Sequence, residues 1–116
     1  MVGRGGYIPE RGDLVWLNFD PQTGREQAGK RPAFVLSRSA YNARSGLFVV
    51  CPITSKIKGY PFEVIITDGL AISGAVLSDQ VKSLDWNARS VSFIAKAPPF
   101  MVDHVSLLSA GIVAGK

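Results

Sequence analysis

The stretch Leu47-Phe48-Val49-Val50-Cys51-Pro52-Ile53 is apolar at every position, which predicts a β-strand that is covered on both of its faces. Short apolar runs of the same kind recur before and after it: Leu14–Phe19, Ala33–Leu36, Phe62–Ile66, Ala75–Leu77 and Val91–Ala95. Turn-forming residues separate the runs, with turns expected at 21–24, 42–46, 58–61 and 67–69. This order predicts a mainly β protein, in which successive antiparallel strands form a small barrel.

The last segment of the chain has a different pattern. Met101, Val105, Leu108 and Ile112 are spaced so that they share one side of a helix, which we expect to pack on the barrel. Pro99 suits the first turn of such a helix, and Gly115 can end it. With 116 residues, 47% of them hydrophobic, and no linker or repeat, we expect a single domain over residues 1–116.

The composition argues against several classes of protein. No stretch approaches the ~20 apolar residues of a membrane-spanning helix, and the start of the chain carries charges and glycines instead of a secretory apolar run. We therefore expect a soluble, cytoplasmic protein that does not contact a membrane. The single cysteine, Cys51, lies inside an apolar run and is interpreted as a buried structural thiol. One histidine and one cysteine leave no cluster with metal-ligand spacing, so we expect no metal and no other cofactor.

Positive charge is concentrated in one part of the sequence. The net charge is +4, but residues 25–58 alone carry +6, because Glu26 is the only acid among seven basic residues. These are Arg25, Lys30, Arg31, Arg38, Arg44, Lys56 and Lys58. Charge alone does not distinguish a solvated face from a surface that binds a polyanion.

Several short motifs follow one another in a characteristic order. They are Gly12-Asp13-Leu14-Val15-Trp16, Asp20-Pro21, Glu26-Gln27-Ala28-Gly29-Lys30-Arg31-Pro32, Pro52-Ile53-Thr54-Ser55, Lys58-Gly59-Tyr60-Pro61-Phe62-Glu63 and Ser78-Asp79-Gln80-Val81-Lys82-Ser83. From about Gly12 to Arg89 the chain resembles the MazF/PemK family of toxin endoribonucleases. The resemblance implies an SH3-like antiparallel barrel of the PemK/CcdB kind, a homodimer, and cleavage of single-stranded RNA that a cognate antitoxin neutralises.

Arg31 and Thr54 are the catalytic residues that the resemblance implies, and their chemistry fits that role. Pro32 fixes the backbone where the chain enters a strand, so Arg31 lies at the leading edge of that strand. Its guanidinium presents a planar fork to phosphate oxygens, although pairing with Glu26 at the surface is an alternative. The hydroxyl of Thr54, at the end of a strand, can donate to a phosphate oxygen but is a poor proton acceptor.

Cleavage without a metal would use the ribose 2′-hydroxyl as an internal nucleophile and leave a cyclic phosphate and a free 5′-hydroxyl. Glu26 is a candidate general base, and an ion pair with Arg25, Lys30 or Arg31 is an equally good interpretation of this residue.

The remaining candidates are expected to bind RNA. Amide side chains can read base edges, aromatic rings can stack on bases, and basic or hydroxyl side chains can hold the backbone. The candidates are Asn18, Phe19, Gln27, Lys30, Ser55, Lys56, Lys58, Tyr60 and Gln80. Of the two aromatic residues, Tyr60 is preferred as a stacking platform, because an aromatic residue inside an apolar strand is more often part of the core.

The expected partners are single-stranded RNA, a second copy of the chain, and an antitoxin that lays a disordered acidic segment along the basic residues. The segment 98–102 is more apolar than is usual in the family, so an exposed Phe100 or Met101 would indicate a partner surface.

Two other functions remain possible from the sequence. One is a gyrase-poisoning toxin of the same fold, although this chain ends Ala114-Gly115-Lys116 without the aromatic terminus typical of such toxins. The other is a barrel that binds single-stranded nucleic acid without cutting it.

Overall fold

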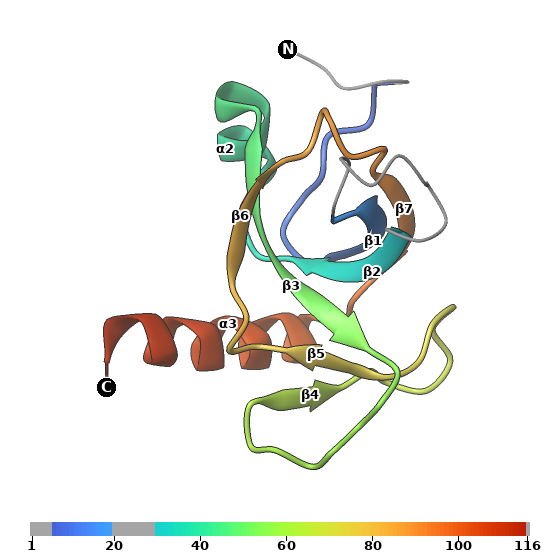
Figure 1. The fold of residues 1–116 in the computed structure, drawn as a ribbon, viewed down its shortest axis with the longest axis vertical. Coiled ribbons are helices and arrows are strands. Elements are labelled where there is room, and N and C mark those ends of the chain that lie inside the picture. The colour runs from blue at the N-terminus through green and yellow to red at the C-terminus, as the bar shows by residue number, and fades with distance from the viewer. Residues whose placement is uncertain (1–5, 20–29, 116) are drawn as a thin grey trace.

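The strands and helices follow the order β1, β2, α2, β3 to β7, α3 in the computed structural model, which describes residues 6–19 and 30–115 (Figure 1). Their bounds are β1 Asp13–Asn18, β2 Lys30–Val35, α2 Ser39–Ser45, β3 Leu47–Thr54, β4 Glu63–Ile65, β5 Ala75–Leu77, β6 Lys82–Asp85, β7 Ser92–Lys96 and α3 Pro99–Ala114. The predicted fold class is confirmed: the protein is mainly β, its strands pair in antiparallel fashion, and a helix follows the last strand.

The longest strand, β3, joins the two parts of the sheet. The strand order is β4-β5-β3-β2-β1-β7, and β6 pairs with β3 outside this path. Along one edge, β3 pairs first with β6 through Leu47–Val50 and then with β5 through Ile53 and Thr54. Its other edge pairs with β2 only as far as Pro52, which lies across from Ala33. The end of β3 therefore lies where the two parts of the sheet diverge (Figure 1).

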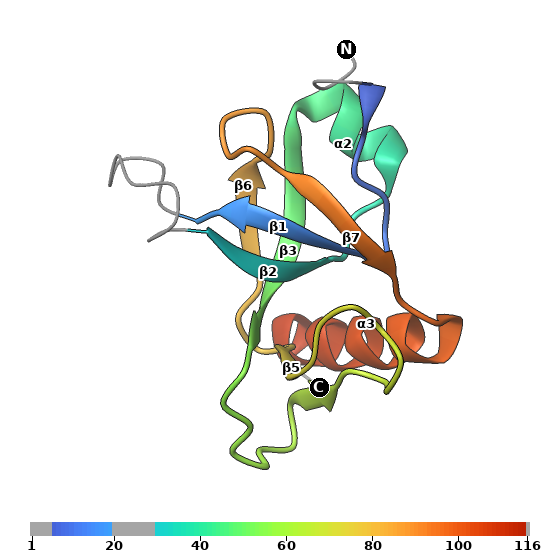
Figure 2. The ribbon, with the colours of Figure 1, turned by 90° about the vertical axis from the view of Figure 1, so that its right-hand side faces the viewer.

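The central strands β1, β2 and β3 have buried side chains on both faces, as the uninterrupted apolar runs predict. Side chains alternate across a strand, so Phe34 and Cys51 belong to one apolar cluster, and Val35 and Val50 belong to another. The first cluster is closed by α3, which runs across one end of the sheet (Figure 2). The second includes Trp86. Because both clusters use alternate residues of the same strands, they fix the register and thereby the position of each strand end.

The helix α3 begins and ends where the sequence predicts. Pro99 is its first residue, and Gly115 ends it in the left-handed conformation with a φ of 75°. The buried residues of the helix are Met101, Val105 and Ser109, which follow one another at intervals of four. Ile112 is 48% exposed. The prediction that Ile112 shares the packed side is therefore wrong. Within the described ranges, no helix is both long and apolar enough to span a membrane.

Cys51 is fully buried in the cluster beneath α3, and its sulfur lies 3.7 Å from the Ser109 hydroxyl. Burial disfavours the thiolate and raises the pKa of this thiol to about 11. At neutral pH the group keeps its proton and packs as a small apolar side chain, which confirms the interpretation as a structural thiol.

Two elements were not predicted. The segment around 42–46 was expected to be a turn, but it closes the helix α2, and the chain turns only at Gly46. Asn42 stabilises this short helix, because its buried side-chain amide donates hydrogen bonds to the carbonyls of Pro9 and Ser37. The strand β6 was missed because its residues are mostly polar and exposed. Pairing with β3 holds it in place, which is a tertiary contact that overrides local preference.

Candidate functional site

A hollow of about 700 Å³ lies where the ends of β2 and β3 separate. We call it the strand-end groove. It is lined by Trp16, Arg31, Pro32, Pro52, Ile53, Thr54, Ser55, Lys56, Ala71, Ile72, Ser73 and Leu77. Four residues predicted from the sequence are thus brought together here, namely Arg31, Thr54, Ser55 and Lys56. They come from segments more than 20 positions apart in the chain.

The register of the sheet explains why Arg31 and Thr54 share this groove. Ala33 is the first residue of β2 that pairs with β3, and its partner is Pro52. The pairing ends there, and Arg31 and Thr54 are each two residues beyond this last pair, on the two diverging strands. The strand ends diverge at this point, so the side chains border an open space instead of packing against each other. A substrate can therefore contact both residues at once.

Arg31 is exposed near the start of β2. It forms no ion pair within the parts of the chain that the structure describes. The paired position on β1 is Leu17, and the next pair, Trp16 and Pro32, also lines the groove. The guanidinium thus projects beside an apolar wall. It can offer its planar set of N–H donors to an anion such as a phosphodiester.

The hydroxyl of Thr54 has a defined orientation. Its oxygen accepts a hydrogen bond of 3.0 Å from the backbone N–H of Lys56, in the turn that follows β3. A hydroxyl has one donor and two acceptor positions, so this bond leaves the proton of Thr54 available for a ligand in the groove. Ser55 and Lys56 are exposed on the same turn. The turn therefore presents a hydroxyl donor and a cation side by side.

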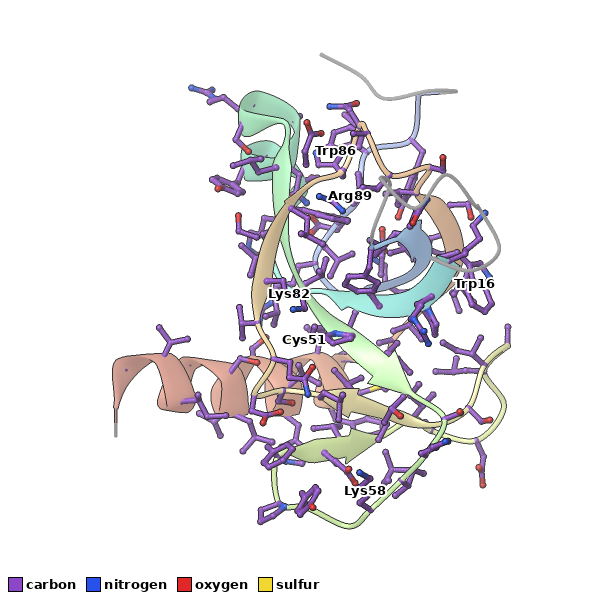
Figure 3. All side chains as sticks on the ribbon, viewed as in Figure 1. Trp16, Cys51, Lys58, Lys82, Trp86 and Arg89 are labelled. Atoms are coloured by element: carbon purple, nitrogen blue, oxygen red, sulfur yellow. The ribbon has the colours of Figure 1, made fainter. Side chains whose placement is uncertain are left out.

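A second, smaller hollow of about 220 Å³ continues from the first, since both include Thr54, Lys56 and Leu77. We call it the tyrosine hollow. It is lined by Thr54, Lys56, Lys58, Tyr60, Phe62, Glu63, Leu77 and Gln80. The predicted residues Lys58, Tyr60 and Gln80 are therefore brought to the same surface as Thr54. In Figure 3, Lys58 lies on the loop that follows β3, and Trp16 lies on β1.

Glu63 and Phe62 shape the loop that forms the tyrosine hollow. The Glu63 carboxylate accepts hydrogen bonds from the backbone N–H groups of Lys58, at 3.1 and 3.3 Å, and of Gly59, at 2.8 Å. The ring of Tyr60 stacks on Phe62 with 5.2 Å between ring centroids. One face of Tyr60 is covered in this way while the residue remains 51% exposed, so a flat ligand group can stack on its other side.

Three predicted RNA-binding residues lie outside both hollows. Phe19 packs against the apolar cluster that contains Trp86, so it belongs to the core, as its place in an apolar run suggested. Asn18 and Lys30 face each other across β1 and β2 at the next pair beyond Arg31. Arg89 holds the end of β1 by donating to the carbonyls of Phe19 at 2.7 Å and Asn18 at 3.4 Å. Figure 3 shows Arg89 near Trp86, far from the Lys58 loop.

Two predicted residues, Glu26 and Gln27, lie outside the described residues. The same holds for the possible ion pair between Glu26 and Arg31.

The basic residues of the stretch 25–58 do not form one surface. Arg31, Lys56 and Lys58 line the two hollows. Arg38 precedes α2, where it lies 3.9 Å from Glu10, and Arg44 is in the last turn of that helix. The helix is at the opposite end of β3 (Figure 1). The expectation that residues 25–58 together line a groove is therefore wrong, because β2 and β3 carry neighbouring charges to opposite ends of the sheet.

Sequence reasoning missed the apolar and loop residues of the strand-end groove. Trp16 is exposed and lines the same groove as Arg31. It is therefore an aromatic side chain at the groove, whereas the predicted Phe19 packs in the core. Ala71, Ile72 and Ser73 form a further wall. Trp16 is a large aromatic residue inside one of the quoted motifs, which is a signal in the sequence. Its exposure between buried strand neighbours is visible only in the structure. The loop 71–73 carries no such signal.

The described residues contain no group of three or more histidine, cysteine, aspartate or glutamate side chains placed to hold a metal ion. The buried carboxylate of Asp13 instead has structural partners. Asp13 is buried and accepts hydrogen bonds from the Tyr7 hydroxyl at 2.6 Å and the Glu10 N–H at 2.9 Å, and Lys96 lies 2.6 Å from it. The groove chemistry that the structure describes rests on cations and hydroxyls.

The fold and the groove together define the class of protein: a small antiparallel β protein with a groove at the ends of its strands that is lined by an arginine, a lysine and hydroxyl side chains. Comparison with known proteins identifies the family. The model of the PemK-like, MazF-like toxin of type II toxin–antitoxin systems matches residues 10–107. The chain belongs to this family.

Individual relatives agree over nearly the whole chain. The endoribonuclease toxin MazF of Escherichia coli strain K12 is 50% identical over 112 residues, which cover 97% of this chain and 96% of that protein. A crystal structure of MazF from Deinococcus radiodurans is 49% identical, with a TM-score of 0.84, and covers 95% of this chain and 99% of that one. A MazE–MazF structure from the same organism is 45% identical, with a TM-score of 0.82 and coverage of 94% and 97%.

Proposed function

We propose that this chain is an endoribonuclease toxin, which cuts single-stranded RNA in the strand-end groove and is neutralised by an antitoxin. The observation that carries the proposal is that Arg31 and Thr54, from the diverging ends of β2 and β3, line the same open groove. The relative of 50% identity is named an endoribonuclease toxin. Messenger RNA is the proposed substrate, so the proposed place of action is the cytoplasm. The proposed consequence of cleavage is that translation and growth are inhibited.

The proposed reaction needs little chemistry from the protein, because RNA supplies its own nucleophile. Attack of the 2′-hydroxyl on the adjacent phosphorus forms a cyclic phosphate, and the bond to the departing 5′-oxygen breaks. Negative charge increases on the phosphate oxygens during this step. Arg31 stabilises that charge with its guanidinium, and the Thr54 hydroxyl donates a hydrogen bond to one of the oxygens. No metal ion is required in this scheme.

The other residues of the two hollows have binding roles in the proposal. Lys56 and Lys58 hold the RNA backbone, and Ser55 can donate to it. Tyr60 stacks on an unpaired base, and Gln80 reads a base edge from the same hollow. Glu26 remains a candidate for the base that accepts the 2′-hydroxyl proton, while Gln27, Asn18 and Lys30 remain candidates for contacts to RNA beyond the hollows.

The direct test is incubation with one long, end-labelled natural RNA. We expect cleavage at a few short sequences, with unchanged rates in excess chelator, because arginine and hydroxyl donors replace a metal in the site. The same sequences held in a stable duplex should remain intact, because in-line attack requires a ribose that can reorient. Loss of activity in chelator with recovery on addition of Mg²⁺ would refute metal independence. Binding without cleavage would favour a barrel that only binds nucleic acid.

Replacing Thr54 with alanine should lower kcat on the order of 10²–10³-fold, the usual effect of removing one donor to a transition-state oxygen. Affinity for uncleaved RNA should change little, since Lys56 and Tyr60 keep their contacts. Single-turnover cleavage and fluorescence binding measure the two quantities separately. Thr54→Ser retains the donor and should retain most of the rate. If Thr54→Ala cuts RNA at the normal rate, Thr54 has only a structural role.

The proposal includes a homodimer, supported by the apolar outer side of α3. Leu107 and Val113 are more than 70% exposed on this helix, and Phe100 is exposed at its start, although Met101 is buried. A chain of this size gains stability by covering such a surface with a second copy. Light scattering should report twice the mass of 12.5 kDa. Leu107→Glu, which places a charge in that interface, should weaken the dimer, and a monomeric wild type would contradict the proposal.

The proposed antitoxin places an acidic, disordered segment along the strand-end groove and the tyrosine hollow. The cations Arg31, Lys56 and Lys58 attract such a segment as they attract RNA, so the two ligands compete. The structural relative from D. radiodurans was solved as MazE–MazF. An acidic peptide that binds this chain without displacing RNA would overturn this part of the proposal.

A further inference from the structure

Gly74 lies directly behind the end of β3, just before the first residue of β5. Its backbone is in the left-handed half of conformational space, with a φ of +125°, and the residue is buried. A Cβ atom at this position would lie 2.2 Å from the Thr54 carbonyl oxygen, 3.1 Å from the Thr54 carbonyl carbon and 3.4 Å from the Ser55 Cα. All three are backbone atoms, so no side-chain rotation could relieve the collision.

Both sides of this contact are held in place. The Gly74 carbonyl accepts a hydrogen bond of 2.9 Å from the Ile66 N–H, which ties it to the residue after β4. The next residue, Ala75, is fully buried and pairs with Thr54 in the register of β3 and β5. Gly74 therefore cannot retreat without breaking strand pairing, and any added atom must displace Thr54 and Ser55.

Such a displacement would act on the groove. The Thr54 hydroxyl oxygen is held by the Lys56 N–H, and Thr54, Ser55 and Lys56 all line the groove. A change in the backbone of Thr54 therefore moves the hydroxyl and the following turn together. Errors of about 1 Å in the placement of a catalytic group can cost on the order of 10² in rate.

We propose that Gly74 is a positioning residue for Thr54: its missing side chain lets the backbone of the loop 71–74 support the end of β3 and sets the direction of the Thr54 hydroxyl. Its effect on the rate rests on the proposed ribonuclease function. Its effect on the Thr54–Lys56 turn does not.

Gly69 provides a matched control for the experiment. It also has a positive φ, +93°, but a Cβ there would meet nothing within 4 Å. An alanine at Gly69 is therefore strained by its backbone angle only, whereas an alanine at Gly74 is strained in the same way and also collides with Thr54. Gly69 lines neither hollow.

The kinetic test compares Gly74→Ala with Gly69→Ala. We expect kcat of Gly74→Ala to fall on the order of 10²-fold with little change in KM, and Gly69→Ala to keep the wild-type kcat. In a Thr54→Ala background, Gly74→Ala should lower kcat little further, because the hydroxyl that Gly74 positions is already absent. Equal rates for the two glycine variants, or fully multiplicative losses in the double variant, would overturn the proposal.

A spectroscopic test separates this inference from the proposed function. In amide NMR spectra without RNA, Gly74→Ala should shift the Ser55 and Lys56 signals, and Gly69→Ala should leave them in place. Unshifted signals in folded Gly74→Ala would overturn the positioning role. If the wild-type chain does not cut RNA, the ribonuclease proposal fails. The spectra still test whether Gly74 positions the turn that contains Thr54 and Lys56.

Hydrogen exchange covers the case in which Gly74→Ala does not fold. In the wild-type chain, the bonds from Ile66 to Gly74 and from Lys56 to Thr54 should open in one event, with equal dependence on denaturant. Equal dependence would support the proposal. A Lys56 amide that exchanges through its own smaller opening would show that the turn moves independently of Gly74, and would overturn it.

Discussion

Replacing Arg31 with alanine should abolish RNA cleavage, with a loss on the order of 10³-fold or more, as expected for an arginine that stabilises a phosphoryl transition state. Arg31 is exposed beside the groove, and the structure gives it no ion pair within the described ranges, so its removal leaves no buried partner unsatisfied. The protein should therefore stay folded with an unchanged melting temperature. Single-turnover rates and circular dichroism test the two statements.

Two further variants define what Arg31 contributes. Arg31→Lys should recover little activity, because an ammonium is a point charge and cannot replace the planar, bidentate guanidinium. Arg44→Ala is the matched control, since Arg44 is an exposed arginine on α2, at the opposite end of β3. It removes the same charge and should keep the rate. Near-normal turnover by Arg31→Ala would remove Arg31 from the proposed mechanism.

A single 2′-deoxyribose at the cut position should prevent cleavage there completely, because the substitution removes the nucleophile itself. The phosphate and the base are unchanged, so contacts to Lys56, Tyr60 and Gln80 remain possible. The modified RNA should thus bind normally and inhibit cutting of unmodified substrate. Denaturing gels report cleavage, and competition assays report binding.

The control is the same substitution several nucleotides away from the cut, which should leave the rate unchanged. The products from unmodified RNA should carry a cyclic phosphate on one fragment and a free 5′-hydroxyl on the other, as internal attack requires. Cleavage of the modified RNA at its deoxyribose would show that water is the nucleophile. The roles of Arg31 and Thr54 would then have to be derived for a different reaction.

The predicted fold depended on local signals that survive in the structure. The apolar runs correspond to strands because each supplies apolar side chains for the two clusters, and Ala75–Leu77 matches β5 without change. The end signals of α3, Pro99 and Gly115, act through their own backbone angles and so are independent of distant contacts. The polar strand β6 and the helix α2 escaped prediction because tertiary partners, β3 and the carbonyls bound by Asn42, hold them in place.

The candidate site was predictable to a similar extent. Arg31 and Thr54 lie at strand boundaries that the sequence marks, and the family resemblance selected them from the many basic and hydroxyl residues. Trp16 and Gly74 were not selected. Their importance depends on which backbone lies beside them, and the neighbouring segments are 15 or more positions away in the chain.

Local sequence patterns specify the apolar strands, the start and the end of α3, and the positions of an arginine and a threonine at strand ends. These properties follow from the period of apolar side chains and from the backbone limits of proline and glycine, which act over a few residues. Which charges share a surface, by contrast, depends on how the strands are arranged in space. Arg31 and Arg38 are seven positions apart, and a strand rises about 3.3 Å per residue, so β2 carries the chain roughly 13 Å away from Arg31 by Val35, before it reaches Arg38. Antiparallel pairing of β2 with β3 then brings Thr54 to the groove that Arg31 lines, because register, not distance along the chain, sets which residues are neighbours.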